Sequence, residues 1–258
     1  MNLRSFAFAI LLSLFSTTLL ADDLTSRQTQ EIDSYISKLI NAEDDELYDL
    51  ANTIRFSGLS DKRLFEKVAE ILKKKHQQLL EIKKPDDQSV NQVKILIMAL
   101  ASSGNSEYWV TLNSILEASS NRNVRNRAHE SMKNISFYQK RNTIMQNYDS
   151  LLENQSLQTK RTLNLLQSDD RKMSRYGAED IHRIGSTDAS VLEWMAAQLE
   201  LQAHHAENKL HVDMLAWYCK ALAKVDKEKY SPLLNKIIKD KSIHSKIRKH
   251  AKKALKAN

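Results

Sequence analysis

The side chains best suited to metal binding cluster once in this sequence. The group comprises His204, His205, Glu207, His211 and Asp213. His204 and His211 would share a face only if one helix ran through both, and Asn208 with Lys209 has the composition of an inter-helix connection. The chain has no H-E-x-x-H pattern, and the group has no cysteine partner. We therefore expect solvated loop residues here rather than a metal site.

Motifs for catalysis or phosphate binding are equally rare. No G-x-S-x-G segment is present, and Cys219 has no base close to it in sequence. No two glycines lie within six residues of each other, which excludes a glycine-rich phosphate loop. Paired carboxylates at residues 44–45, 86–87 and 169–170 fall where helices are expected to begin, and there they offset the helix dipole. We expect no catalytic residues, no cofactor and no enzymatic activity.

The elements that carry these residues occur twice. Residues 93–132 and 213–255 match at an offset of 122, with one further residue inserted before the last helix, which brings apolar positions of one copy onto apolar positions of the other. Tyr108 falls on Tyr230 in this alignment. Cys219 falls on Ile97, inside an apolar run, so we expect a buried thiol that acts as a small hydrophobic side chain.

A preceding pair of helices is duplicated at an offset of 127. Gly58 falls on Gly185, and Gly104 occupies the same kind of turn between helices. Glycine at these positions suits a backbone that must end a helix. In the fourth turn Asp226 replaces glycine, and we expect the following helix to begin at Ser231-Pro232.

Two segments carry a recognisable repeat signature. Residues 124–132 read V-R-x-x-A-x-x-x-M, and residues 247–255 read I-R-x-x-A-x-x-x-L. Both resemble the V-R-x-x-A-x-x-x-L signature of HEAT repeats, most of all the short bacterial HEAT-like repeats. The resemblance implies an all-α fold, a right-handed α-solenoid of HEAT/armadillo-like helix pairs with an internal duplication. It further implies a binding surface, usually without catalytic activity, and structural roles for Arg125 and Arg248.

Composition and repeat spacing agree with such a fold. The chain has only 4 Gly and 2 Pro in 258 residues, too few for the many tight turns of a sheet protein. Successive turns are separated by 46 and 41 residues, close to the roughly 40–47 of HEAT and armadillo units. We assign residues 22–136 to a first half of the solenoid, residues 137–170 to divergent central helices, and residues 171–258 to a second half with a basic capping helix.

The first 21 residues have the layout of a secretory signal peptide. Arg4 precedes an apolar run of about 15 residues, which is shorter than the ~20 that span a bilayer, and Ala21 is the expected cleavage point. We therefore expect an exported protein of the periplasm, with no membrane span. A eukaryotic secretory route is an alternative, because two N-x-S segments would then accept glycans.

Two tryptophans are candidate contact residues. Trp109 follows the packed Tyr108 and matches the polar Ser231 of the other copy, and Trp194, between Leu192 and Met195, is a similar candidate. Each is either an exposed contact residue or partly buried under a neighbouring helix. Trp217 aligns with Ile95, and we expect it in the core.

Charge is concentrated at the C-terminus. Residues 220–258 contain 13 Lys+Arg and 3 Asp+Glu, a net of +10, whereas residues 22–219 contain 25 and 29, a net of −4. The last helix is expected to point five lysines away from its apolar stripe: Lys246, Lys249, Lys252, Lys253 and Lys256. They either give a terminal repeat its polar outer face or form a docking patch for an anionic partner.

The sequence thus predicts an exported, non-enzymatic scaffold or adaptor that binds a protein or peptide along a helical-repeat surface. The alternatives are electrostatic binding of an envelope polyanion through the basic C-terminal repeat, or a role as accessory subunit of an enzyme. Nucleic acid is not an expected partner, because the basic segment lacks interleaved aromatic residues and the protein is exported.

Overall fold

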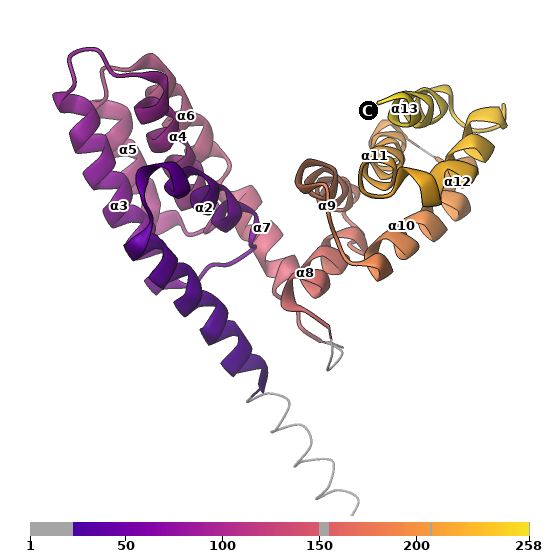
Figure 1. The fold of residues 1–258 in the computed structure, drawn as a ribbon, viewed down its shortest axis with the longest axis horizontal. Coiled ribbons are helices and arrows are strands. Elements are labelled where there is room, and N and C mark those ends of the chain that lie inside the picture. The colour runs from indigo at the N-terminus through magenta and orange to yellow at the C-terminus, as the bar shows by residue number, and fades with distance from the viewer. Residues whose placement is uncertain (1–22, 150–154, 207, 258) are drawn as a thin grey trace, which may run out of the picture. The chain divides into compact units, whose positions relative to one another are not determined.

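A computed structural model describes residues 23–149, 155–206 and 208–257, and every regular element in these ranges is helical (Figure 1). This confirms the expected all-α class. The expected signal peptide, residues 1–21, lies outside the described residues. Every helix in the described ranges is too short or too polar to span a bilayer.

The chain divides into two compact units. Unit 1 contains the described residues up to 55 and residues 59–136, whereas unit 2 contains residues 56–58 and the described residues from 137 onward. The central segment, residues 137–170, belongs to unit 2.

Unit 1 begins with a helix over residues 23–41. It continues with α2 (Asp44–Phe56, whose last residue is assigned to unit 2), α3 (Lys62–Glu81), α4 (Asp87–Ala101), the short 3-10 helix η1 (Ser106–Tyr108), α5 (Trp109–Ala118) and α6 (Arg122–Lys133). Helix α4 packs against α3 and α6, and α5 packs against α6. Both faces of α4 are therefore covered, which explains why its sequence is apolar almost throughout.

Unit 2 begins with α7 (Ile135–Met145, whose first two residues are assigned to unit 1) and α8 (Leu157–Leu166). It continues with α9 (Arg171–Ile184), α10 (Ala189–Gln202), the short η2 (Ala203–His205), α11 (Lys209–Val225), α12 (Lys227–Lys239) and α13 (Ser245–Lys256). Helix α11 is central, because α9, α10, α12 and α13 all pack against it. Leu215, Cys219 and Leu222 of α11 are fully buried in the core of this unit.

The two copies seen in the sequence have the same pattern of burial. Leu112 and Leu234 are both 0 % exposed, and Ile115 and Ile237 are both 2 % exposed. The equivalence extends to polar atoms, since the hydroxyl groups of Tyr108 and Tyr230 are both buried without a hydrogen-bond partner. Positions paired by sequence therefore occupy equivalent environments in the two units.

The turns between helices follow the glycine pattern. Gly58, Gly104 and Gly185 have φ of 75°, 71° and 76°, in the left-handed region that side chains with a Cβ adopt poorly. In the fourth turn Asp226 has φ of −146° and serves both to end α11 and to cap α12, its side chain accepting a hydrogen bond from the Lys229 backbone N–H.

The expected helix start at Ser231-Pro232 is wrong. Helix α12 begins four residues earlier, at Lys227, and Pro232 lies inside it. The carboxylate of Asp226 already caps the first turn, so the helix has no need of a later cap. The Ser231 hydroxyl instead donates to the carbonyl of Lys227.

The signature arginines have structural roles, as the repeat resemblance implied. Arg125 donates from Nη1 to the carbonyls of Ser119 and Ser120, at 3.0 and 2.6 Å. Arg248 donates from Nε to the carbonyl of Ile243 at 3.0 Å. Each arginine thus binds the connection that precedes its own helix, and neither is a candidate ligand-binding residue.

The central segment departs from the repeat pattern because it buries two arginines. Arg141 and Arg161 are both 0 % exposed. Arg141 lies over the ring of Tyr138 at 4.7 Å from the ring centre, and Arg161 donates from Nε to the hydroxyl of Tyr148 at 2.7 Å. Buried charges need such hydrogen-bond and ring partners. The apolar spacing of α7 and α8 did not reveal them.

Candidate functional site

The strongest candidate site is a hollow of about 530 Å³ within unit 2, which we call the lysine pocket. It is lined by His182, Lys220, Ala223, Lys224, Val225, Lys227, Lys253, Ala254 and Ala257. The residues belong to the ends of α9, α11 and α13 and to the start of α12. Segments far apart in sequence therefore bring four lysines to the lining of one hollow.

Aromatic contacts hold one side of this pocket in place. The Lys220 ammonium lies over the ring of Trp217, 3.5 Å from the ring centre. His182 meets the same indole edge-on, with ring centres 5.5 Å apart. Lys227 donates from Nζ to the carbonyl of Ala257 at 2.6 Å, which connects the start of α12 to the end of α13. The pocket is therefore positioned by specific contacts as well as by helix packing.

The pocket has a positive local field. Burial lowers the pKa of His182 from its ordinary value, and the charges of Lys220 and Lys224 lower it further. The pKa of Lys220 is also lowered, mainly because the ammonium is partly removed from water. A nearby positive charge disfavours protonation of a neighbour, so the shift of His182 agrees with cations close to it.

The pocket lysines differ from other lysines of unit 2 in their partners. Lys229 pairs with Glu193 at 3.1 Å, Lys236 with Glu200 at 2.5 Å, and Lys246 with Asp213. Within the described part of the chain, none of the four pocket lysines forms an ion pair with a carboxylate.

Two carboxylates that act on Lys220 already have cationic partners. Glu179 and Asp213 lie close enough to favour the charged form of Lys220. Glu179, however, pairs with Arg175 at 3.2 Å, and Asp213 pairs with Lys246. Neither carboxylate forms an ion pair with a pocket lysine.

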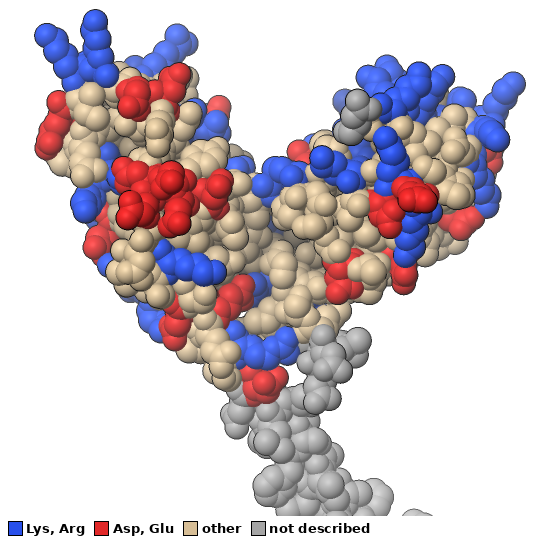
Figure 2. Space-filling view, viewed as in Figure 1, with Lys and Arg blue, Asp and Glu red and all other residues tan. Residues whose placement is uncertain are grey.

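The basic face of α13 was expected, and the structure places its residues in three different settings. Figure 2 shows Lys and Arg side chains gathered over the part of unit 2 that carries α13. Lys249, Lys252 and Lys256 are exposed there, whereas Lys253 lines the lysine pocket. Lys246 does not point freely away from the helix as expected, because α13 packs on α11 and brings it to Asp213.

The two candidate tryptophans have different environments. Trp109 is 48 % exposed at the start of α5, and the adjacent Val110 is exposed as well. Trp194 is partly buried and meets the ring of Tyr218 edge-on, 6.3 Å between ring centres. Trp217 is only partly buried, and the expectation that it lies in the core is wrong because its ring supports Lys220 and His182 beside the pocket.

The described histidines of this group lie in two different helices. Helix η2 ends at His205 and α11 begins at Lys209, so His204 and His211 do not share a helix. His204 contacts Ser242 from Nδ1 at 3.0 Å, whereas the buried His211 contacts Gln202 from Nε2 at 2.9 Å. Among the described residues, no three His, Cys, Asp or Glu side chains are arranged to hold a metal ion.

Other isolated side chains are mostly structural. Burial raises the pKa of the Cys219 thiol to about 12, which makes it an inert core residue as expected. His76 is buried on α3 with its Nε2 unpartnered. His244 caps α13 by accepting from the Lys246 backbone N–H. None of these groups faces the lysine pocket as a lining residue.

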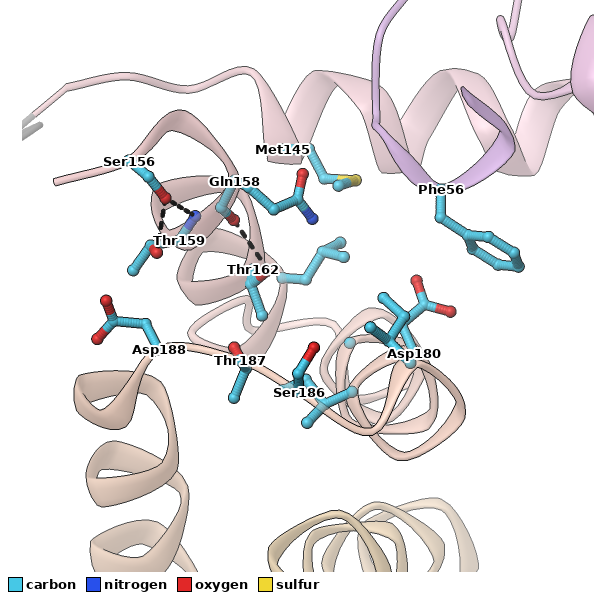
Figure 3. A pocket seen from close by; sticks show the side chains of 14 residues that line it. Phe56, Met145, Ser156, Gln158, Thr159, Thr162, Asp180, Ser186, Thr187 and Asp188 are labelled. Atoms are coloured by element: carbon cyan, nitrogen blue, oxygen red, sulfur yellow. Dashed lines mark hydrogen bonds between the residues drawn. The ribbon is translucent and has the colours of Figure 1, made fainter. Parts of the chain in front are cut away.

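A second hollow, of about 220 Å³, lies between α8, α9 and the start of α10 (Figure 3). Hydroxyl and carboxylate groups line much of it. Ser156 donates to the Thr159 hydroxyl and accepts from its backbone N–H, while Asp188 accepts from the backbone N–H of Ser190. Thr162 donates to a backbone carbonyl. Because these groups already cap or stabilise helices, this hollow is the weaker candidate.

Sequence reasoning missed most of the lysine pocket. His182, Lys220, Lys224 and Lys227 were not singled out, although Lys220, Lys224 and Lys227 are spaced by four and three residues. A comparison of the two copies contains the relevant signal. The residues that match Lys220, Lys224 and Lys227 in the first copy are uncharged: Met98, Ser102 and Asn105.

No family model matches this chain, and no curated protein matches it. Among solved structures, it is similar to the crystal structure of an engineered protein, a Northeast Structural Genomics Consortium target. That match has 13 % identity and a TM-score of 0.28, and it covers 88 % of this chain and 95 % of the other. So low a score adds nothing about the fold or function of this protein.

Proposed function

We propose that this chain is an exported, non-enzymatic protein that binds an anionic partner at the lysine pocket. Its architecture in this proposal is a right-handed solenoid of HEAT-like helix pairs. The matched burial of the two copies supports that architecture, as do the equivalent contacts of Arg125 and Arg248. Stacked helical repeats commonly serve as recognition surfaces.

The observation that carries the proposal is the contrast between paired and unpaired lysines. An ammonium group that is partly removed from water is stabilised by a carboxylate or another anion. Lys229, Lys236 and Lys246 of unit 2 have such partners, whereas the four lysines that line the pocket form no ion pair among the described residues, although Lys220 is partly removed from water. A bound anion would supply the missing interaction.

The proposed compartment is the periplasm. Its support is the charged, apolar and small-residue order of the first 21 residues. The single cysteine is consistent with this, because the fold does not rely on disulfides. In that compartment the partner would be an exported protein or an envelope component.

The first candidate partner is a protein or peptide with an acidic segment. The exposed pair Trp109 and Val110 on unit 1 favours a protein, because exposed aromatic side chains are frequent at protein interfaces. The second candidate is an envelope polyanion. It is favoured by the excess of unpaired positive charge in the pocket, which suits a multiply charged ligand.

Crosslinking capture from an envelope extract, repeated over a range of salt concentrations, tests this function. We expect the double variant Lys220→Glu with Lys224→Glu to lose capture. Lys239→Glu with Lys241→Glu is the matched control, because it changes net charge equally at exposed positions outside the pocket. Both variants should retain the helical circular dichroism of the parent.

Recovery of one discrete protein would identify the first candidate, and recovery of anionic polymer or lipid would identify the second. Equal capture by the pocket variant and the control variant would contradict the proposal. It would mean that net charge, rather than the lysine pocket, recruits the partner.

A further inference from the structure

The charge of the lysine pocket can be compared with the helix ends that surround it. The pocket lies at the C-terminal ends of α9, α11 and α13 and at the N-terminal end of α12. Lysines near C-terminal helix ends have an ordinary structural role, since they offset the negative end of the helix dipole. The question is whether this role accounts for all of the positive charge at the pocket.

It does not. Three C-terminal ends contribute about −1.5 elementary charges, one N-terminal end about +0.5, and the carboxylate of Asp226 at the start of α12 about −1, so four lysines leave an excess of about two positive charges. Lys227 directly satisfies one terminal carbonyl, that of Ala257. Even if that interaction removes one charge from the count, about one positive charge remains. A bound anion would balance it.

The type of cationic side chain further restricts the class of anion that fits the pocket. Among the described residues, four lysines and no arginine line the pocket. Arginine offers a planar fork that matches a carboxylate, whereas lysine acts as a compact point charge with three donors. Several lysines at different helix ends therefore suit a tetrahedral group whose oxygens point in different directions.

The size and walls of the pocket indicate that the ligand is larger than an inorganic ion. Its volume of about 530 Å³ is typical of small-molecule sites, which range over ~300–1,000 Å³. The apolar part of the wall is formed by Ala223, Val225, Ala254 and Ala257. An organic body attached to the anionic group would contact these side chains.

From these observations we infer that the lysine pocket binds a phosphate monoester that carries an organic group. This inference rests on the proposed function, because it names the chemical group that enters the same pocket. Lys220, Lys224 and Lys253 neutralise the phosphate oxygens, and the apolar wall contacts the attached body. The phosphate belongs either to a soluble compound such as a sugar phosphate or to the headgroup of a lipid surface.

Isothermal titration of the purified protein tests the inference with glucose 1-phosphate as the soluble probe. Glucuronate provides a sugar with a single carboxylate, and glucose 6-sulfate provides a tetrahedral monoanion. We expect the phosphate to bind at least about tenfold more tightly than either at pH 7.5, where a phosphate monoester carries close to two charges. Affinity should fall at pH 5, where the phosphate becomes a monoanion.

A pocket variant and a control variant locate the site. Lys224→Gln with Lys253→Gln should weaken glucose 1-phosphate binding at least about tenfold, because it removes two of the four ammonium groups. Both side chains are exposed, so the variant should fold. Lys249→Gln with Lys252→Gln removes the same charge from the outer face of α13 and should bind as the parent does.

The lipid source is tested with vesicles of phosphatidylcholine that contain phosphatidic acid, a phosphate monoester, or phosphatidylglycerol, a diester. Preference for phosphatidic acid vesicles without binding of glucose 1-phosphate would assign the phosphate to a lipid, and the reverse would assign it to a soluble compound. Either result supports the inference if the variant Lys224→Gln with Lys253→Gln abolishes the observed binding.

Equal, pocket-dependent binding of glucuronate and glucose 1-phosphate would overturn the phosphate inference and leave the proposed function intact. Failure of both glucose 1-phosphate and phosphatidic acid vesicles to bind, together with partner capture that still requires Lys220 and Lys224, would also overturn the phosphate inference alone. Capture that is indifferent to those lysines would overturn the proposed function as well.

Discussion

Helices α4 to α6 of unit 1 and α11 to α13 of unit 2 are two versions of one framework. Several of their buried positions match, as Leu112 with Leu234 and Ala128 with Ala251 show. Their charges do not match. The pocket residues Lys220 and Lys253 correspond to Met98 and Glu130, and neither of these is a cation.

This difference separates residues that stabilise the fold of both copies from residues that the fold does not require. Helix α4 ends without a basic residue in its last turn, whereas α11 ends with Lys224. At the end of α4 the hydroxyl of Ser102 donates to the carbonyl of Ala99 at 2.6 Å. Because the same helix end is stable without lysine, helix capping alone does not explain the cations of unit 2.

The largest effects should come from the shared framework. Ala128→Asp and Ala251→Asp each place a carboxylate at a position that is 0 % exposed, and an unpaired buried charge costs about 3 kcal/mol or more. Asn126→Asp and Ser245→Asp introduce the same group at exposed positions of α6 and α13 and should change the unfolding free energy little. Urea unfolding measures all four. If aspartate were tolerated at only one of the two buried positions, the two copies would not be equivalent there.

The turn glycines should show a smaller, equal effect in both units. Gly104→Val and Gly185→Val force a β-branched residue into the left-handed region, at a cost of about 1–2 kcal/mol. At Gly185 an added Cβ has ordinary contact distance to Lys224, so the backbone rather than a clash sets the cost. Asparagine at the same positions is the matched control, because it tolerates positive φ better. Melting temperatures that are unchanged by valine would contradict this explanation.

The Lys246 ion pair should contribute less still. Both partners are partly exposed, and such pairs are worth about 0.2–1 kcal/mol. Lys246→Gln should therefore lower the unfolding free energy only slightly, and a double-mutant cycle with Asp213→Asn measures the coupling. Because Lys246 does not line the pocket, its loss should leave partner capture unchanged. Loss of capture would place the anion on the outer face of α13 instead.

Histidine titration separates burial from charge in the two units. Burial alone lowers the pKa of His76 on α3, whereas Lys220 and Lys224 add to the effect of burial on His182. For both residues the unfolded chain binds protons more readily, so stability is lost as pH falls below about 6.5 through the folded pKa. Nuclear magnetic resonance should show that added salt raises the pKa of His182 and leaves that of His76 unchanged. An equal effect of salt on both pKa values would mean that the charges of Lys220 and Lys224 do not distinguish His182 from His76.

Local patterns in the sequence were sufficient for the all-α class, the glycine turns and the buried positions of the two copies. They depend on helical periodicity and on residues close together in the chain, as Gly104 and Gly185 illustrate. The start of α12 was misplaced because Pro232 suggested a first turn, although Asp226 provides the cap.

The lysine pocket was harder to predict for a physical reason. It combines His182, Lys220, Lys227 and Lys253, which come from four helices and meet only after α9, α12 and α13 pack on or beside α11. The pairing of Lys246 with Asp213 likewise depends on a contact between residues 33 positions apart. Charge counts along the chain locate the basic segment but do not distinguish paired lysines from unpaired ones.

The most direct test of the central claim is to map which lysines a bound anion protects. Brief acetylation with a hydroxysuccinimide ester, read by mass spectrometry, compares each lysine with and without the captured partner or glucose 1-phosphate. The account predicts that Lys220, Lys224, Lys227 and Lys253 become protected, while Lys239, Lys241 and the lysines of unit 1 react as before. Protection spread over the exposed lysines of α13, with the four pocket lysines unchanged, would contradict it.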